Sequence, residues 1–280
     1  MAKMDLAHKK KVRRRVNKKS SKVHFDKYEL YRKAVQSAEN DVVFIRDTYK
    51  ELKGKNPRTF REDFCGTFAL STEWIKLNPR HESVGIDLDP EPMAYGRQNY
   101  LVKLRPEQQR RMKLIEGNVL DPNLPKADVI AAMNFSYFCF KQREVIKKYF
   151  VNALKSLNKD GMFLVDIFGG SQCYDAIEDT IKHEGFTYYW DQTNFDPVTN
   201  EALFHIHFRV GGKKIEQVFT YDWRIWTIPE IRDIMMEAGF RKTHVYWEGT
   251  AKDGSGDGNF TRVDHGEACQ SWIAYVVGEK

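Results

Sequence analysis

A segment at 61–70, REDFCGTFAL, has the residue types of a ligand-binding backbone turn. It lies between a predicted strand at 59–64 and a predicted helix at 68–78, where a doubly wound sheet binds its ligand. Gly66 lets the backbone come close to a cofactor, and the helix N-terminus presents unpaired N–H groups. We therefore expect a cofactor to bind at this turn.

Polar side chains follow the next three predicted strands. The second strand ends in Asp87, where a carboxylate is positioned to accept hydrogen bonds from both hydroxyls of a ribose. Asn118 follows the third strand, and Asn134 follows the fourth. Asp89 directly precedes a proline, so for this second acid we favour a helix cap over a ligand contact.

This spacing resembles that of the class I S-adenosylmethionine-dependent methyltransferases over roughly residues 57–170 and 221–277. In that family an acid opens a glycine-rich turn around the methionine end of the cofactor, a second acid holds the ribose, and a polar residue meets the adenine. The resemblance implies S-adenosylmethionine as cofactor. It assigns contacts to Glu62, Asp63, Phe64, Gly66, Thr67, Asp87, Leu88, Asn118, Val119, Asn134 and Phe135, and to Tyr28 and Tyr31 of a preceding helix.

Longer stretches are similar to a widespread bacterial group of these methyltransferases whose substrate is unassigned. They are YELYRKAVQ at 28–36, REDFCGT at 61–67, GIDLDPEP at 85–92 and FTYDWRIWT at 219–227.

The turn departs from the family pattern at its outer glycines, which are Phe64 and Phe68 here. Gly66 is then the residue of the turn that can adopt a left-handed conformation without cost. The same departure argues against an NAD-dependent dehydrogenase, because a pyrophosphate needs close approach of the backbone. A sulfonium amino acid has no phosphate and tolerates a bulkier turn.

Strand-like and helix-like segments alternate through the first part of the chain, which predicts a parallel sheet covered on both faces. After 170, aromatic segments that alternate in polarity predict an antiparallel meander, and the earlier pattern then resumes. The expected strands are 59–64, 82–87, 112–116, 128–133, 161–168, 241–247 and 271–277, the helices 68–78, 91–104, 141–157 and 228–238, and the meander 186–192, 201–210 and 214–222. The Gly- and Asp-rich stretch at 252–260 is expected to be a loop.

We thus predict an α/β fold: a doubly wound, mostly parallel, seven-stranded sheet of the Rossmann-like class I methyltransferase type. The predicted parts are a disordered basic tail at 1–22, an N-terminal helical lid at 23–56, a cofactor-binding half at 57–170, an antiparallel insertion capping the acceptor at 171–222, and the C-terminal end of the core sheet at 223–280.

Two histidines in the meander, His205 and His207, share one face of a strand because they are two residues apart. One interpretation has them facing water. The other turns this face toward the acceptor, where histidine can take a proton near neutral pH. On the second interpretation both are catalytic candidates together with Tyr137, and Tyr137, Arg224 and Trp226 are candidates for acceptor binding.

The net charge of +6 divides unevenly, because residues 1–22 carry +9 and the rest of the chain −3. The tail is either a solvated arm or a nucleic-acid-binding or targeting signal. The four cysteines lie far apart without metal-ligand spacing, so we expect no metal site and a reducing, cytoplasmic location. The chain shows neither a signal peptide nor an apolar run that would span a membrane.

The predicted function is S-adenosylmethionine-dependent methylation of a small organic acceptor. Three alternatives stay open: an RNA or DNA methyltransferase that uses the basic tail, a non-catalytic nucleotide-binding scaffold, and an NAD-dependent Rossmann enzyme.

Overall fold

The computed structural model describes residues 25–252 and 254–280. The predicted basic tail at 1–22 therefore lies outside the described residues.

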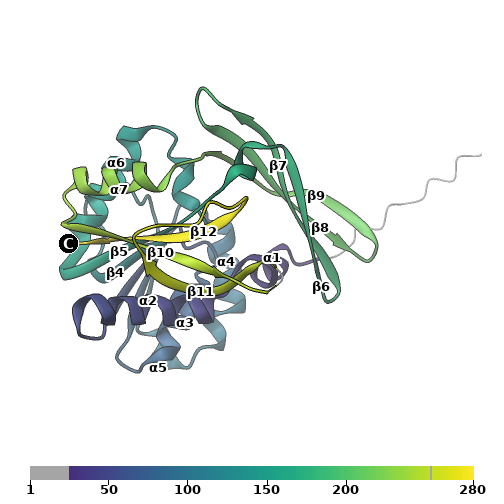
Figure 1. Cartoon of the computed structure of the whole chain (residues 1–280). Coiled ribbons are helices and arrows are strands. Elements are labelled where there is room, and N and C mark those ends of the chain that lie inside the picture. Colours follow the sequence, from purple (N-terminus) through teal and green to yellow (C-terminus); the bar gives the residue numbers. More distant parts are fainter. Residues whose placement is uncertain (1–24, 253) are drawn as a thin grey trace, which may run out of the picture.

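A large, mostly parallel sheet forms the centre of the molecule (Figure 1). In the part of the chain that the structure describes, it has eight strands in the order β11-β10-β12-β5-β4-β1-β2-β3. β5, β4, β1, β2 and β3 run parallel to one another, whereas β12, β10 and β11 continue the sheet at one side with antiparallel pairings between neighbours. The strands are β1 (Thr59–Asp63), β2 (Glu82–Asp87), β3 (Met112–Glu116), β4 (Ala127–Ala132), β5 (Leu157–Gly169), β10 (Lys242–Thr250), β11 (Gly256–Val263) and β12 (Trp272–Glu279).

Helices cover both faces of this sheet. α2 (Ala38–Lys53) and α3 (Ala69–Leu77) pack on one face, and α6 (Arg143–Ser156) and α7 (Ile228–Ala238) pack on the other (Figure 1). Each pair buries an apolar stripe against the strands, which separates the core into two clusters. The predicted doubly wound architecture is confirmed.

Shorter helices connect these elements. α4 (Pro90–Asn99) follows β2, and the predicted helix at 91–104 ends early because the chain turns into the short helix η1 (Leu101–Lys103). The remaining short helices are α5 (Pro106–Gln109), η2 (Ser136–Cys139) and η3 (Ser171–Tyr174).

The prediction of seven strands misses one strand of the main sheet. The loop predicted at 252–260 is also wrong from Gly256 onward, because β11 begins there. This strand pairs with β10 at the edge of the sheet. Most of its residues are exposed, so backbone hydrogen bonds stabilise it rather than apolar burial. Its sequence for that reason lacks the usual apolar pattern of a strand.

A second, antiparallel sheet lies beside the first (Figure 1). Its order is β6-β7-β8-β9, with β6 (Ile177–His183), β7 (Phe186–Asp196), β8 (Glu201–Val210) and β9 (Lys213–Arg224). The three predicted meander strands are present, and β6 is an addition that the sequence did not reveal because it is polar and largely exposed. One face of this sheet carries Phe204 and Trp223 into the main core.

The first described helix, α1 (Lys27–Val35), packs against the same antiparallel sheet. Asp26 caps the helix by accepting hydrogen bonds from Tyr28 and Glu29 N–H (3.1 and 3.0 Å). Of the two helices in the predicted lid, α1 borders the cavity described below, whereas α2 is a core helix. Among the described helices, none has the length and apolarity needed to cross a membrane.

Candidate functional site

A cavity of about 490 Å³ opens at the carboxyl ends of β1, β2 and β4. Its floor comes from the turns that follow these strands, and its other walls come from α1 and β9. A volume of this size is typical of small-molecule sites, which span about 300–1,000 Å³. The described residues that line it are Lys27, Tyr28, Tyr31, Gln36, Glu62, Asp63, Phe64, Cys65, Gly66, Thr67, Asp87, Asp89, Pro92, Met133, Asn134, Ser136, Cys139, Phe219, Thr220, Tyr221, Asp222 and Trp223.

The turn after β1 is left-handed at three alternate residues: Phe64 (φ 56°), Gly66 (φ 50°) and Phe68 (φ 51°). The two phenylalanines thus adopt the conformation that glycine adopts freely, at a cost of order 1–3 kcal/mol each. Burial compensates, since Phe68 is fully buried. Gly96 of α4 completes the fit, because a Cβ there would lie 2.4 Å from the carbonyl oxygen of Thr67.

The two acids that end β1, just before this turn, have different environments. Glu62 is buried and accepts a hydrogen bond from Ser71 N–H (2.8 Å), and burial raises its pKa to about 7. Asp63 accepts two hydrogen bonds from Arg61 (2.8 and 3.0 Å) and one from the Tyr149 hydroxyl (2.9 Å). Asp63 therefore borders the cavity, but its carboxylate is already hydrogen-bonded to buried side chains of the core.

Asp87 lies at the tip of β2, on the cavity wall. Its carboxylate accepts hydrogen bonds from Gly66 N–H (2.6 Å) and Asp89 N–H (2.9 Å), and burial raises its pKa. It thereby links the β1 and β2 turns. The predicted cap is confirmed: Asp89 precedes α4 and accepts a hydrogen bond from Glu91 N–H (2.9 Å).

The turn after β4 is left-handed at two successive residues, Asn134 (φ 58°) and Phe135 (φ 55°). Their N–H groups donate to the two carboxylate oxygens of Asp166 on β5, at 2.6 and 2.9 Å. Sequence reasoning missed Asp166. The available signal was a single acid inside the apolar strand GMFLVDIF.

Several predicted cofactor residues lie near these turns without lining the cavity. Leu88 is largely exposed, and Val119 is buried in the core. Asn118 instead closes its own turn, since its Oδ1 accepts a hydrogen bond from Leu120 N–H (2.9 Å). Phe135 is partly buried against the main core.

Aromatic residues of α1 and β9 form the upper wall of the cavity. Tyr28 and Tyr31 both contact Phe219, with ring centroids 6.1 and 5.1 Å apart. The Tyr28 hydroxyl donates to Glu91 of α4 (3.1 Å), so α1 is tied to both the α/β part and the antiparallel sheet. The lining residues that we had not predicted are Lys27, Gln36, Cys65, Asp89, Pro92, Met133, Ser136, Cys139 and 219–223. For part of this set the signal was present in the sequence, in the segments 28–36 and 219–227 that resemble the bacterial methyltransferase group.

The structure does not place Tyr137, Arg224 and Trp226 on the cavity wall. Tyr137 is fully buried, and burial raises the pKa of its hydroxyl well above the usual value. Arg224 stacks on the buried Trp226 ring at 3.9 Å and donates to Glu230 (3.2 Å). Tyr137 and Trp226 are thus part of the main core, and Arg224 is held against the Trp226 ring.

His205 and His207 also lie outside the cavity wall. They lie on the face of β8 opposite Phe204 and Phe208, which pack into the cores. They do not face open water either, since they are 6% and 5% exposed. His205 Nδ1 lies 2.9 Å from Oγ1 of Thr220, which itself lines the cavity, so one residue separates His205 from the cavity. The geometry therefore gives no support to a catalytic role for these histidines.

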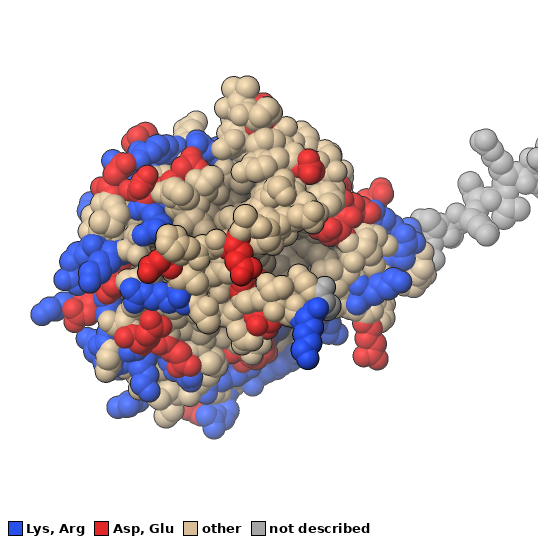
Figure 2. All heavy atoms as spheres, viewed as in Figure 1, with Lys and Arg blue, Asp and Glu red and all other residues tan. Residues whose placement is uncertain are grey.

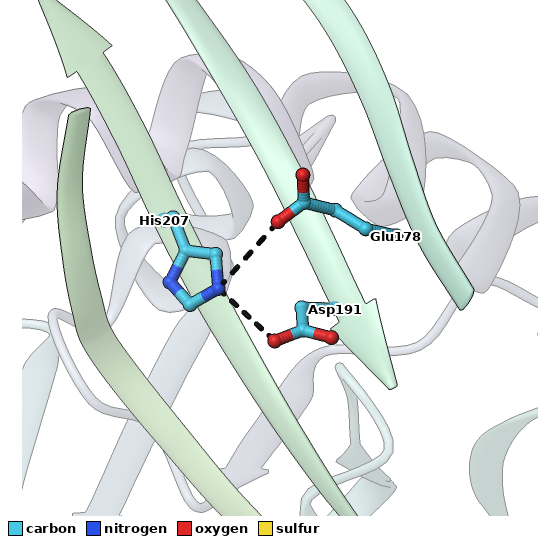
Figure 3. Close-up of side chains that lie close together, drawn as sticks. All are labelled: Glu178, Asp191 and His207. Carbon is cyan, nitrogen blue, oxygen red and sulfur yellow. Dashed lines mark hydrogen bonds and ion pairs between the residues drawn. The ribbon is translucent and has the colours of Figure 1, made fainter. Parts of the chain in front are cut away.

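His207 Nε2 lies 3.1 Å from an Asp191 carboxylate oxygen and 3.8 Å from one of Glu178, a cluster close enough to share a metal ion (Figure 3). Its ring is nevertheless oriented against metal binding. Gln217 N–H donates to Nδ1 (2.7 Å), so Nε2 carries the proton and donates to Asp191 (3.1 Å). The ammonium of Lys214 already pairs with Glu178 (2.5 Å). This cluster is therefore best explained as hydrogen-bonded support of the sheet.

No protein-family model matches the chain, and no curated protein matches it. Solved structures do match. A S-adenosylmethionine-dependent methyltransferase from Clostridium acetobutylicum ATCC 824 is 17% identical at a TM-score of 0.63, covering 90% of this chain and 96% of its own.

Two further matches are sugar-modifying enzymes. CalS10, an amino pentose methyltransferase from Micromonospora echinaspora, is 15% identical at a TM-score of 0.64, covering 92% of this chain and 98% of its own. The sugar N-methyltransferase KedS8 from Streptoalloteichus sp ATCC 53650 is 13% identical at a TM-score of 0.60, covering 100% and 98%. At these identities the likeness shows the fold, which is that of the class I methyltransferases.

Proposed function

We propose that this protein is a S-adenosylmethionine-dependent methyltransferase that acts on a small organic acceptor. One observation supports the proposal most directly. Residues 62–67, Asp87 and Asn134 line the same cavity, and aromatic residues of α1 and β9 line its opposite side. These groups come from three separate turns that the sequence placed in register with the methyltransferase pattern.

The residues present fit the cofactor. Asp87 offers a carboxylate for the ribose hydroxyls, and the left-handed turn at Gly66 leaves room for close approach of a ligand to the backbone. Gln36 adds a buried Oε1 without a hydrogen-bond partner in the described structure, on the cavity wall. Such an atom favours a ligand with N–H or O–H donors. When bound, the cofactor supplies an electrophilic methyl group on a sulfonium.

The chain's own contribution is orientation and exclusion of water. Tyr31, Phe219 and Tyr221 close the cavity from above, and Trp223 extends this wall into the core. Aligning an acceptor with the methyl group can supply several kcal/mol of the activation barrier, roughly 7 kcal/mol or more in favourable cases. Aromatic faces suit a compact organic acceptor better than a long polymer.

The matched enzymes CalS10 and KedS8 are described as methylating an amino pentose and a sugar, which supports a small acceptor for this fold arrangement. Figure 2 supports it too, because acidic and basic side chains are intermingled on the visible face instead of forming a basic track. A nucleic acid would need such a track to bind its phosphates.

The test is calorimetric binding of S-adenosylmethionine to the wild type and to Asp87→Ala. We expect the variant to bind at least about tenfold more weakly, since a charge-assisted hydrogen bond is worth about 1.5–3 kcal/mol. Asp121→Ala, in the exposed loop after β3, is the matched control and should bind like the wild type.

Turnover is tested with tritiated cofactor and a panel of amines, phenols, sugars and carboxylates. Tight binding of NADH with no binding of S-adenosylmethionine would overturn the proposal in favour of a dehydrogenase.

A further inference from the structure

We propose that Asp166 is the positioning residue of the cavity: its ionised carboxylate holds the Asn134–Phe135 turn so that Asn134 lies on the cavity wall. The proposal deepens the proposed function and rests on it for the role of the cavity. Asp166 itself does not line the cavity and is 6% exposed within β5. It would therefore act through the turn rather than touch a ligand.

The contact uses both carboxylate oxygens. Asn134 N–H donates to Oδ2 (2.6 Å) and Phe135 N–H donates to Oδ1 (2.9 Å). The backbone of both residues is left-handed, a conformation that L side chains disfavour. Successive backbone N–H groups in a turn can form a concavity that binds an anion, and here the anion is the protein's own carboxylate.

Protonation would remove half of this contact. A neutral carboxyl group turns one of its two oxygens into an O–H donor, so one N–H of the turn faces another donor instead of an acceptor. The turn would lose one of the two hydrogen bonds that compensate for its left-handed backbone. Asn134 would then no longer be fixed on the cavity wall.

The surroundings of Asp166 place this change near neutral pH. The facing groups are Asp41 of α2, Tyr31 of α1, Tyr137 of η2 and Tyr275 of β12. Burial, with a smaller contribution from the Asp41 charge, raises the pKa of Asp166 to about 7 although the two N–H groups oppose the shift. The carboxylate that holds the turn is therefore present above about pH 7 and is lost as the pH falls.

Asp128 provides a matched control at the opposite end of the sheet. Its Oδ2 accepts hydrogen bonds from two successive N–H groups, those of Arg58 (2.8 Å) and Thr59 (2.9 Å). Its hydrogen bonds outweigh burial and lower its pKa, so this contact does not titrate near pH 7. Asp128 does not line the cavity.

The first experiment measures backbone amide exchange of Asn134 and Phe135 in the full chain without ligand, as protection factors on either side of pH 7. In the wild type we expect protection to fall at least tenfold on acidification. In Asp166→Asn it should be low at both pH values. Asp128→Asn should lose protection at Arg58 and Thr59 and keep the wild-type behaviour of the β4 turn. Wild-type protection of that turn in Asp166→Asn would overturn the proposal.

The second experiment measures S-adenosylmethionine binding by calorimetry above pH 7. Asp166→Asn is expected to bind at least tenfold more weakly, and Asp128→Asn within twofold of the wild type. Equal losses in both variants would mean that Asp166 is merely structural. If the wild type itself binds no S-adenosylmethionine, the proposed function fails, whereas the exchange experiment still decides whether Asp166 holds the turn.

Discussion

At the scale of single residues, backbone strain gathers around the cavity. Phe64 and Phe68 in the β1 turn, and Asn134 and Phe135 in the β4 turn, all have positive φ. Strained residues persist where the surrounding packing fixes them, and they concentrate at functional sites. The rings that hold Phe64 in place are those of Phe140 and Tyr149, at 5.6 and 5.7 Å between centroids. The packing of the core thus compensates for the backbone strain at the site.

The strain at Phe64 predicts an inverted order of stability for two substitutions. Phe64→Gly and Phe64→Ala both remove the ring, but glycine adopts φ 56° freely and alanine does not. We expect Phe64→Gly to be the more stable by about 1 kcal/mol. Denaturant unfolding measures the difference.

Phe60 is the control, a fully buried residue of β1 with ordinary strand geometry. There Phe60→Ala should be more stable than Phe60→Gly, by about 0.5–1 kcal/mol. The same order at both positions would show that the left-handed turn carries no strain.

The raised pKa of Glu62 predicts how the free energy of unfolding depends on pH. Burial raises its pKa from 4.5 to about 7, so the folded state binds this proton more tightly than the unfolded state. Its contribution to the free energy of unfolding is therefore full below about pH 4.5 and decreases as the pH rises to about 7. The total change is roughly 3 kcal/mol at most, at 1.36 kcal/mol per pKa unit.

Denaturant unfolding between these pH values checks this expectation. Glu62→Gln should flatten the slope, and the exposed Glu144→Gln should not. The raised pKa values of Asp166, about 7, and Asp41, about 6, act in the same direction on the global free energy of unfolding, although the ionised form of Asp166 makes the local contact with its turn. An unchanged slope in Glu62→Gln would contradict the assignment.

At the scale of elements, a bulge in the antiparallel sheet shapes the upper wall of the cavity. β8 and β9 shift register between Ile206 and Phe208, so that residues 216–218 of β9 face His207 alone. Bulges of this kind bend and twist a strand. Beyond the bulge, Phe219 and Tyr221 line the cavity. His207 is thus placed to support the bulge rather than to catalyse a reaction.

Replacing His207 with alanine should therefore affect the sheet more than the cofactor site. The Gln217 N–H loses its acceptor, which costs about 1–3 kcal/mol in the free energy of unfolding. We expect S-adenosylmethionine affinity within twofold of the wild type, and no rise in thermal midpoint on adding Zn²⁺. His265→Ala, in an exposed loop, should match the wild type in both measurements. A Zn²⁺-dependent stabilisation that His207→Ala abolishes would instead indicate a metal site.

At the scale of the whole molecule, α1 joins the two sheets. Tyr28 binds Glu91 on the α/β side, and Leu30 and Tyr31 pack in the core of the antiparallel sheet. The Tyr95 hydroxyl also donates to Asp26, the cap of α1 (2.8 Å). This one helix, which contacts both parts, therefore supplies one wall of the cavity between them.

The described residues that line the cavity all follow 1–22, so we expect deletion of that basic segment to leave S-adenosylmethionine affinity unchanged. Turnover of a small acceptor should also persist. Any binding to nucleic acid should disappear with the segment and, in the full chain, weaken steeply with salt, because it depends on counterion release. The measurements are calorimetry and salt-dependent binding to a structured RNA. Loss of RNA methylation with cofactor binding retained would favour the nucleic-acid alternative.

The sequence by itself determined the order of most strands and helices along the chain and the turns that border the cavity. Those features depend on local periodicity and on polar residues such as Glu62, Asp87 and Asn134 at predicted strand ends, which are properties of short segments. The edge strands β6 and β11 escaped detection because their backbone pairing leaves most side chains exposed.

Only the tertiary structure decided which side chains reach the cavity. The direction of a side chain depends on how far a turn or a strand rotates, and a change of one residue moves it to the other face. Tyr137 and Trp226 therefore turned into the core, and His207 turned toward the bulge of β9. Asp166 gained its place through contact with a turn about thirty residues away in the chain, which no local pattern encodes.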